Sequence, residues 1–513
     1  MNTNPSSIKK STVITYLTQI LSIGISFIYV PIMLGILGQE EYGLYALVQS
    51  IVSYFLMSDM GIGITATRYN AKYIAEKDIK GQRAINGMFL ILYVGISLFC
   101  ALVGYVLYLQ LPTIYSHYSP ESVDLVQKLF VLAMINLVLT LVFKVFNAII
   151  NAYEKFVFAK TLVFIQSVFG PLAMLAVLFW GYRSVGMVMV TTLMTLLFGI
   201  VQMIYCFSVL KVKFDFSKFD KALFLTIMSF TIFVFLNSLS HQLFSNSDKI
   251  IVSILLTEAS VAIYAIVIQF QTYFYNFTNV LSGFYLPRFT KAVKESRVVS
   301  HELIEDIIRT GRVQLIIAGL VFGGFLSLGL PFIVRWVGPE YELSYYLTLF
   351  VLFCEFTASS QSMFNSLMQA MNLHKFRSII GFISAIIKVF ITIALVYVWG
   401  IWGCAIAYFI SFFIRLIAYN VYYKHIGIDI VYFWKKILRL LIPLSTIILS
   451  LYVLFSIIQK FVCLENYLFI VVFATLYGTL FLWLLWIFGF NDYEKHLSKQ
   501  MYNRLTTVFN HGK

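Results

Sequence analysis

Long apolar segments, separated by short polar loops, run through almost the whole chain of 513 residues. A helix that crosses a bilayer needs ~20 mostly apolar residues, and about fourteen segments meet this requirement. The apolar run that begins at residue 222 is too long for one span, so we divide it near Thr257. The predicted spans are 12–36, 43–67, 84–110, 126–150, 156–180, 185–210, 222 to about 256, about 259–287, 303–330, 343–371, 376–398, 401–423, 433–458 and 467–490. The pattern therefore predicts an all-α integral membrane protein with about 14 transmembrane helices.

The composition agrees with this interpretation, because 60% of the residues are hydrophobic and 12% are charged. Soluble domains are about half apolar and about one quarter charged. The first apolar run follows Lys9 and Lys10, is too long for the core of a signal peptide and has no cleavage site of small residues. We therefore expect it to be the first span.

The net charge of +14 is distributed unevenly between the two sets of alternate loops. Most lysines and arginines fall in one set, and the other set is nearly free of them. The positive-inside rule assigns the basic set to the cytoplasm, which places both termini there. Anionic membrane lipids then account for the basic charge, and nucleic acid is not expected as a partner.

Two stretches about 220 residues apart resemble each other, which indicates an internal repeat. Each begins with a polar turn, continues as an apolar helix and ends at an arginine. The matching pairs at this spacing are Tyr45 with Tyr264, Arg68 with Arg288, Lys155 with Lys375, and Trp180 with Trp399. Because each copy holds six spans, the second copy enters with the orientation of the first. The repeat is therefore predicted to be parallel, with a pseudo-twofold axis along the membrane normal.

The repeat predicts three parts of the chain. Residues 1–210 form an N-lobe of helices 1–6, and residues 211–424 form a C-lobe of helices 7–12. Residues 425–513 hold two additional helices and a cytoplasmic tail. A central cleft between the two six-helix lobes is the expected substrate path.

Signatures of soluble enzymes are missing from the sequence, so we do not expect an enzyme. There is no Walker A loop, no dinucleotide fingerprint, no HExxH and no nucleophile elbow. Five cysteines and seven histidines show no metal-binding spacing. No cofactor is expected, and without a nucleotide site the driving force would be an H+ or Na+ gradient or the substrate's own gradient.

Ionisable residues inside the predicted spans are the candidate functional residues, because a charge at a helix centre costs at least about 2.5–3.5 kcal/mol. Lys388 and Arg415 lie in the middle of the eleventh and twelfth spans. They could line a polar cavity, or they could form a buried structural pair with a carboxylate such as Glu355. Glu355 could itself be a salt-bridge partner or a proton carrier.

Five further charged residues lie within or at the ends of the predicted spans. Arg68 and Arg288 could anchor helix ends, or they could meet phosphate at the mouth of the cleft. Lys144 could extend to the lipid headgroups or contribute to the cleft. Asp59 and Asp248 are candidates for ion coupling or for structural roles. Cations outnumber anions in this set, which favours an anionic substrate such as a diphosphate.

Three motifs carry a resemblance to a known family. The first is Leu37-Gly38-Gln39-Glu40-Glu41-Tyr42-Gly43-Leu44-Tyr45, followed by Asp59-Met60-Gly61-Ile62-Gly63 and Arg68-Tyr69. The second is Asp248-Lys249-Ile250-Ile251-Val252, leading to Ile263-Tyr264-Ala265, and the third is Trp336-Val337-Gly338-Pro339-Glu340-Tyr341. The chain resembles the polysaccharide transporter family, the Wzx-type flippases of the multidrug/oligosaccharidyl-lipid/polysaccharide superfamily. The second motif is degenerate at Glu258-Ala259-Ser260-Val261, where many relatives keep a glycine.

The resemblance implies a flippase for undecaprenyl-diphosphate-linked oligosaccharide repeat units, working by alternating access in the bacterial inner membrane. Such units are used for O-antigen, capsule or exopolysaccharide, and the polymerase machinery is an implied partner. Three alternatives stay open: a cation-coupled multidrug exporter, a flippase for the peptidoglycan lipid precursor, and a membrane-embedded polymerase or ligase. The last would need a larger extracytoplasmic loop than residues 110–125 provide.

Overall fold

The computed structural model describes residues 5–217, 221–278, 289, 301–371, 373–461 and 467–496. In this part of the chain the secondary structure is helical, and no strand occurs. The helices are α1 (Pro5–Leu56), η1 (Met57–Asp59), α2 (Ile62–Ala75), α3 (Ile79–Ile114), α4 (Pro120–Ala152), α5 (Phe156–Phe179), α6 (Arg183–Ile204), η2 (Tyr205–Val209), α7 (Lys221–Leu255), α8 (Glu258–Thr278), α10 (His301–Val337), η3 (Pro339–Tyr341), α11 (Glu342–Ser359), α12 (Ser362–Ala370), α13 (His374–Trp399), α14 (Trp402–His425), α15 (Ile430–Gln459) and α16 (Tyr467–Phe488). The predicted all-α fold is confirmed.

Ten helices in the described part are long and apolar enough to cross a membrane, or eleven if a bent pair counts as one span. The bent pair is Pro339–Ser359 with Ser362–Ala370, which meet at 49°. The first of the ten, Val13–Ala75, covers two of the predicted spans. Helices α7 and α8 lie at the predicted seventh and eighth spans, although neither is among the ten. The protein is thus a multi-pass membrane protein.

The boundary between the first two predicted spans is a sharp break at Gly38. This residue has φ 76° and ψ 173° inside the continuous stretch of α1. A positive φ is strained for residues with a Cβ and easy for glycine. Gly38 therefore lets the chain turn back without an intervening loop.

The second predicted span is itself interrupted near its centre. Helix η1 ends at Asp59, Met60 follows with φ 48°, and α2 starts at Ile62. A non-glycine residue with positive φ is uncommon. The interruption places the partly buried Asp59 at a helix break in an otherwise apolar segment.

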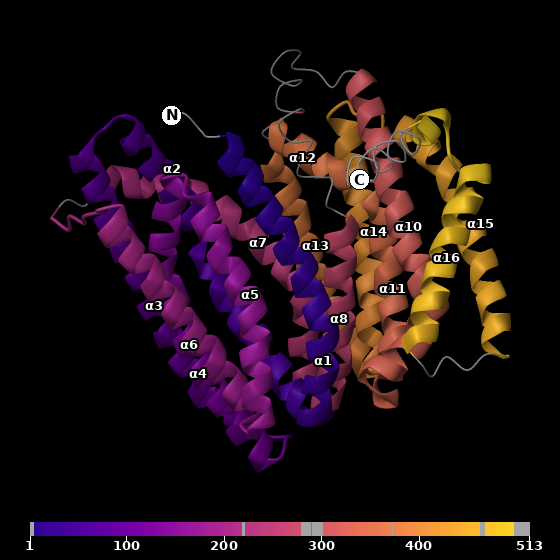
Figure 1. Ribbon diagram of the computed structural model, residues 1–513, viewed down its shortest axis with the longest axis horizontal. Helices are drawn as coiled ribbons and strands as arrows, with labels where there is room; N and C mark the ends of the chain where they lie inside the picture. The colour runs from indigo at the N-terminus through magenta and orange to yellow at the C-terminus, as the bar shows by residue number, and fades with distance from the viewer. Residues whose placement is uncertain are drawn as a thin grey trace, which may run out of the picture. The chain divides into compact units, whose positions relative to one another are not determined.

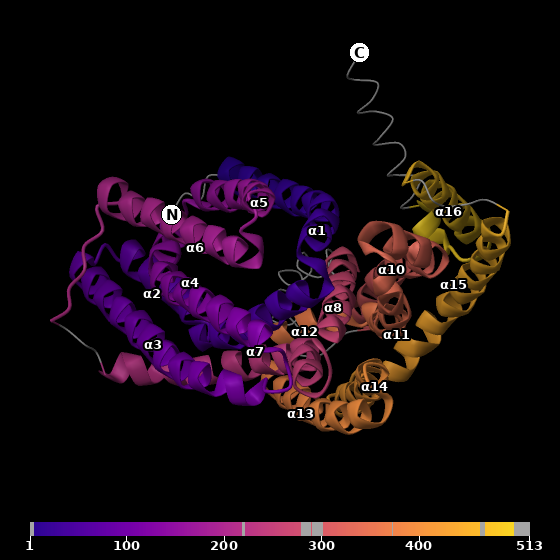
Figure 2. The ribbon, with the colours of Figure 1, turned by 90° about the horizontal axis from the view of Figure 1, so that it is seen from below.

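The described helices form two compact units, which are treated separately below. The first unit is Met1–Ala265 with Val396–Ile401. Within it α4 packs against α3, α6, α1 and α2, while α1 also packs against α5 and α7. Helices α1 and α5 lie side by side in both views of this unit (Figures 1 and 2). Helix α4 is therefore the central element around which the first unit is built.

The second unit is Ile266–Leu395 with Trp402–Lys513, and α10 is its central helix. Helix α10 packs against α11, α15 and α16, and α14 packs against α11. Its core includes the fully buried side chains of Phe364, Phe433, Leu444, Phe455 and Phe481. The predicted lobe boundary at residues 210–211 and the predicted cleft remain predictions.

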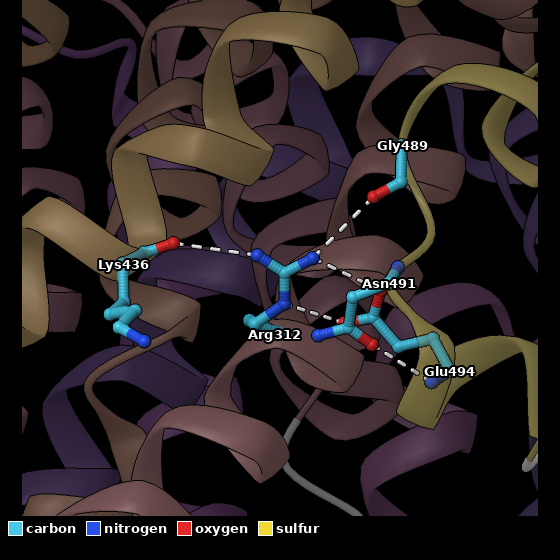
Figure 3. Close-up of polar contacts among 5 residues, drawn as sticks. All are labelled: Arg312, Lys436, Gly489, Asn491 and Glu494. Atoms are coloured by element: carbon cyan, nitrogen blue, oxygen red, sulfur yellow. Dashed lines mark hydrogen bonds and ion pairs between the residues drawn. The ribbon is translucent and has the colours of Figure 1, made fainter.

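One buried ion pair fixes the C-terminal helices to α10. Arg312 donates to both carboxylate oxygens of Glu494, at 2.6 Å from Nε and 3.0 Å from Nη2, and both side chains are buried (Figure 3). The same guanidinium donates to the backbone oxygens of Lys436 and Gly489, each at 3.4 Å. The backbone N–H of Asn491 donates to Glu494, which completes the network. Arg312 thus ties α10 to α15 and to the segment after α16.

Candidate functional site

The first sequence motif has a structural role that is visible in its hydrogen bonds. Glu41 accepts from the Arg183 side chain at 2.5 Å and from the backbone N–H of Ser184 at 2.9 Å. Arg183 also donates to the Leu37 backbone oxygen at 2.8 Å. Ser184 lies in the first turn of α6, where backbone N–H groups have no partner within the helix. The Glu41 carboxylate accepts a hydrogen bond from one of these N–H groups. The motif therefore holds α6 against α1.

Gly43 in the same motif lies against the start of α8. A Cβ at this position would be 2.0 Å from the Glu258 backbone oxygen and 3.4 Å from the Ala262 backbone nitrogen. Real Cβ atoms do not approach a backbone oxygen so closely, so glycine is required for this packing. Glu258 and Ala262 lie in the sequence assigned to the second copy of the predicted repeat, and in the structure they belong to the same compact unit as Gly43.

Asp59 and Lys144 form an ion pair within the first unit. The Lys144 ammonium on α4 lies 3.3 Å from Oδ2 of Asp59, and both side chains are partly exposed. The hydroxyl of Tyr93, on α3, donates to Oδ1 of Asp59 at 2.5 Å. The structure therefore joins one predicted substrate-binding residue to one predicted ion-coupling residue.

Asp248 is fully buried on α7. It accepts a hydrogen bond at 2.5 Å from the hydroxyl of Tyr264, on α8. Tyr264 is the tyrosine of the predicted second repeat copy, and its hydroxyl supplies a hydrogen-bond donor to this buried carboxylate. A buried carboxylate without hydrogen-bond donors would be costly.

Glu355 lies in a polar cluster within the second unit. Its Oε1 accepts from the Tyr408 hydroxyl at 2.5 Å and from the Gln271 side chain at 3.1 Å. Gln271 also donates to the Tyr408 hydroxyl at 2.7 Å, and its own oxygen is buried without a hydrogen-bond partner. The fully buried Lys388 places its ammonium 5.6 Å from the centre of the Tyr408 ring. Glu355 and Lys388 thus share Tyr408 as a common neighbour.

The three predicted arginines differ in what the structure describes of them. Arg415 interacts electrostatically with Tyr408, the common neighbour of Glu355 and Lys388. The Arg415 guanidinium on α14 lies 5.7 Å from the ring centre of Phe412, and the residue is half-buried. Arg68 is exposed on α2. Arg288 lies outside the described residues. A role for these arginines in phosphate binding stays a prediction.

The three predicted intramembrane carboxylates share one feature that the sequence did not reveal. Each accepts a hydrogen bond from a tyrosine hydroxyl, and the pairs are Asp59 with Tyr93, Asp248 with Tyr264, and Glu355 with Tyr408. Hydrogen bonds to the ionised form stabilise a carboxylate in an apolar setting. The chain contains 33 tyrosines, so the sequence does not single out these three.

Comparison with known proteins identifies the family. The pattern of the family described as Polysaccharide biosynthesis protein matches residues 8–293, which is more than half of the chain. The chain belongs to this family. The comparison with curated proteins gave no match.

Solved structures confirm the type of fold. "Lipid II flippase MurJ, inward closed conformation" has a TM-score of 0.69 at 16% identity, over 93% of this chain and 98% of that one. An inward-facing multidrug resistance MATE family transporter of the MOP superfamily has a TM-score of 0.63 at 13% identity, over 78% and 95%. The Vibrio cholerae MATE transporter VcmN in the bent form has a TM-score of 0.53 at 15% identity, over 82% and 98%. This member of the polysaccharide biosynthesis family therefore has the MOP-superfamily transporter fold.

The candidate site residues of this polysaccharide biosynthesis family member are described by the chemistry of their side chains. Within the part of the chain that the structure describes, no three His, Cys, Asp or Glu side chains gather as metal ligands. The polar side chains are instead lysines, carboxylates and tyrosine hydroxyls on apolar helices. Lysine ammonium groups bind phosphates as point charges, and carboxylates bind protons or monovalent cations.

Proposed function

We propose that this protein is a flippase that carries lipid-linked oligosaccharide units, joined to undecaprenyl diphosphate, from the cytoplasmic to the periplasmic leaflet. The units would serve the synthesis of O-antigen, capsule or exopolysaccharide, with the polymerase as the next user. Membership of the polysaccharide biosynthesis family and the transporter fold support this proposal. The protein would lie in the bacterial inner membrane with both termini in the cytoplasm.

The single observation that carries the choice of an anionic substrate is the burial of Lys388. A fully buried lysine on an apolar helix is expensive unless an anion or a π-system faces it. Its ammonium lies 5.6 Å from the centre of the Tyr408 ring, and the Tyr408 hydroxyl donates to Glu355, so Lys388 belongs to a polar cluster within the second unit. A diphosphate that enters the interior during transport would be attracted by this buried cation. In this proposal Lys388 and Arg415 balance the diphosphate within the membrane, and Arg68 and Arg288 receive it at the cytoplasmic mouth.

Ion coupling is part of the same proposal. Glu355, Asp59 and Asp248 are the carboxylates that could bind H+ or Na+ during the cycle. Glu355 has the most suitable surroundings, because Tyr408 and Gln271 offer it neutral polar groups.

The double variant Lys388→Gln with Arg415→Gln tests the proposed function. In a strain without its native copy, we expect surface polysaccharide to fall by about tenfold or more, which corresponds to the loss of ~1.4 kcal/mol of binding. The exposed Lys128 is the matched control, and Lys128→Gln should restore the normal amount of polysaccharide. Immunoblots of the membrane fraction would show that each variant is inserted equally well. Normal polysaccharide in the double variant would refute the assignment.

The same strain separates the proposed function from its two transporter rivals. The peptidoglycan-precursor flippase is favoured by the similarity to MurJ. If that were the function, deletion would be lethal, whereas loss of a surface-polysaccharide flippase alters the coat. Increased drug sensitivity with an unchanged coat would favour a multidrug exporter instead.

A further inference from the structure

The ion pair between Lys144 and Asp59 is not sealed inside the first unit. The exposed fractions of the two side chains are 32% and 22%. By contrast, Asp248 and Lys388 are fully buried. Gly63, the second residue of α2, faces the Asp59 carboxylate, and even a Cβ there would be 3.9 Å from Oδ1 and 4.0 Å from Oδ2. No side chain from this position of α2 covers the pair.

Each charged atom of the pair has a defined partner. Oδ2 of Asp59 faces the Lys144 ammonium at 3.3 Å, and Oδ1 accepts from the Tyr93 hydroxyl at 2.5 Å. Among the described residues, Tyr93 and Lys144 are the polar partners of Asp59. If Lys144 moved to another anion, Tyr93 would continue to hold the carboxylate.

The contact is weak enough to be exchanged. A partly exposed ion pair contributes only about 0–1 kcal/mol, because water screens the charges and the long side chain loses freedom. A phosphate or diphosphate carries more negative charge and more acceptor oxygens than one carboxylate. It should therefore compete well for the Lys144 ammonium.

The local backbone also favours an exchangeable site. Asp59 ends η1, directly before Met60 with its positive φ, so it lies on a break between two helices. Broken helices inside membranes are tolerated where they line a polar cavity, and they commonly form the binding sites of transporters. Lys144, in contrast, is fixed on the continuous helix α4.

We propose that Lys144 is a binding group for a phosphate or diphosphate in the first unit, and that Asp59 occupies it as an intramolecular competitor when no anion is bound. The anion replaces the Asp59 carboxylate at the ammonium, and Tyr93 retains the displaced carboxylate. This inference rests on the proposed function only in naming the lipid-linked diphosphate as the natural anion. Free diphosphate offers the same chemistry.

The variant Asp59→Asn tests the competition directly. The amide keeps an oxygen for the Tyr93 hydroxyl but loses the negative charge. We expect the affinity of the full-length protein in nanodiscs to rise about three- to fivefold, the equivalent of removing a competing pair worth about 0.6–1 kcal/mol. The probes are inorganic pyrophosphate and farnesyl diphosphate, measured by calorimetry. A gain with both indicates recognition of the diphosphate, and a gain with farnesyl diphosphate alone indicates that the lipid is required.

Asp124→Asn is the matched control. Asp124 pairs with Lys128 on the same helix as Lys144, at 2.6 Å, but both side chains are mostly exposed. This variant makes the same change in net charge as Asp59→Asn. It should leave the affinity for both probes unchanged. An equal gain in affinity in Asp59→Asn and Asp124→Asn would instead indicate a general electrostatic attraction of the more positive protein.

Lys144→Gln completes the experiment. It should lower the affinity for both probes, and adding Asp59→Asn to it should bring no gain. If Asp59→Asn binds both probes no better than the unaltered chain, the pair is only structural and the inference is wrong. A chain that binds diphosphate through Lys144 but does not restore surface polysaccharide would refute the proposed function and support this site.

Discussion

Arg312 shows how one side chain can hold a segment that lies far away in the sequence. The four hydrogen bonds of its guanidinium end on Glu494, Lys436 and Gly489, on two separate segments (Figure 3). The ion pair is almost completely enclosed. Such a pair adds little compared with a well-packed apolar contact, but the loss of one partner leaves a buried charge.

Arg312→Met should therefore destabilise the protein strongly. We expect a loss of about 3–5 kcal/mol, because Glu494 stays buried without its cation. The measurement is thermal unfolding of the purified protein in detergent. Arg309→Met is the matched control one turn earlier, where the arginine is half-exposed and pairs with Asp306 at 3.8 Å.

A double variant separates the buried charge from lost packing. Arg312→Met combined with Glu494→Met removes both charges and should recover part of the stability. If the Arg312→Met protein were as stable as the Arg309→Met control, the stabilising role assigned to the Arg312–Glu494 ion pair would be wrong.

At the level of single residues, the sequence singled out the charged residues of the clusters described above but not their hydrogen-bond partners. Asp59, Glu355 and Lys388 stood out because charges are rare in apolar spans. Tyr93 and Gln271 did not, because they lie 34 and 84 residues from the carboxylates that they contact. Tyrosine and glutamine are common on helix surfaces, so only the folded structure shows which of them contact the carboxylates.

Among the elements, α1 and α8 make the closest backbone approach described above, at Gly43. Gly43→Ala should push the two helices apart and cost about 1–3 kcal/mol, because the blocking atom belongs to the backbone and cannot rotate away. Gly35 is the comparison position in α1, on the other side of the break at Gly38, where an added Cβ meets no atom within 4 Å. Gly35→Ala should be neutral or stabilising, since alanine favours a helix over glycine by about 1 kcal/mol.

Thermal unfolding and the amount of protein in the membrane would check both alanine variants together. Equal behaviour of Gly43→Ala and Gly35→Ala would contradict the packing assigned to Gly43.

The elements themselves were largely predictable, and their interruptions were less so. All fourteen predicted segments contain helix, because a run of apolar residues in lipid has few other ways to satisfy its backbone. The break at Gly38 was predicted between two spans. The break at Met60–Gly61, between η1 and α2, was not predicted, because the hydrophobic pattern continues across it and methionine is not a residue that signals a positive φ.

For the whole molecule, the charge pattern predicts which loops face the cytoplasm, and single cysteines can test it. Lys80 and Asp124 are exposed near opposite ends of the α3–α4 hairpin. In intact spheroplasts, a membrane-impermeant maleimide should label Asp124→Cys and not Lys80→Cys. In permeabilised cells, the maleimide should label both cysteine variants.

The native cysteines provide a low background for this labelling. The four in the described part, Cys100, Cys206, Cys354 and Cys404, are buried, and Cys463→Ser removes the fifth. Labelling of Lys80→Cys in intact spheroplasts would reverse the predicted orientation.

The contact of Gly43 with the start of α8 also has a consequence for how the protein is made. A chain leaving the ribosome inserts its first helices long before residues 258–262 exist, more than two hundred residues later. During that interval the bare glycine face of α1 has no native cover. The first unit can therefore complete its packing only late in synthesis, and a ribosome that stops before Glu258 would leave this face open to chaperones, other nascent helices and quality-control proteases.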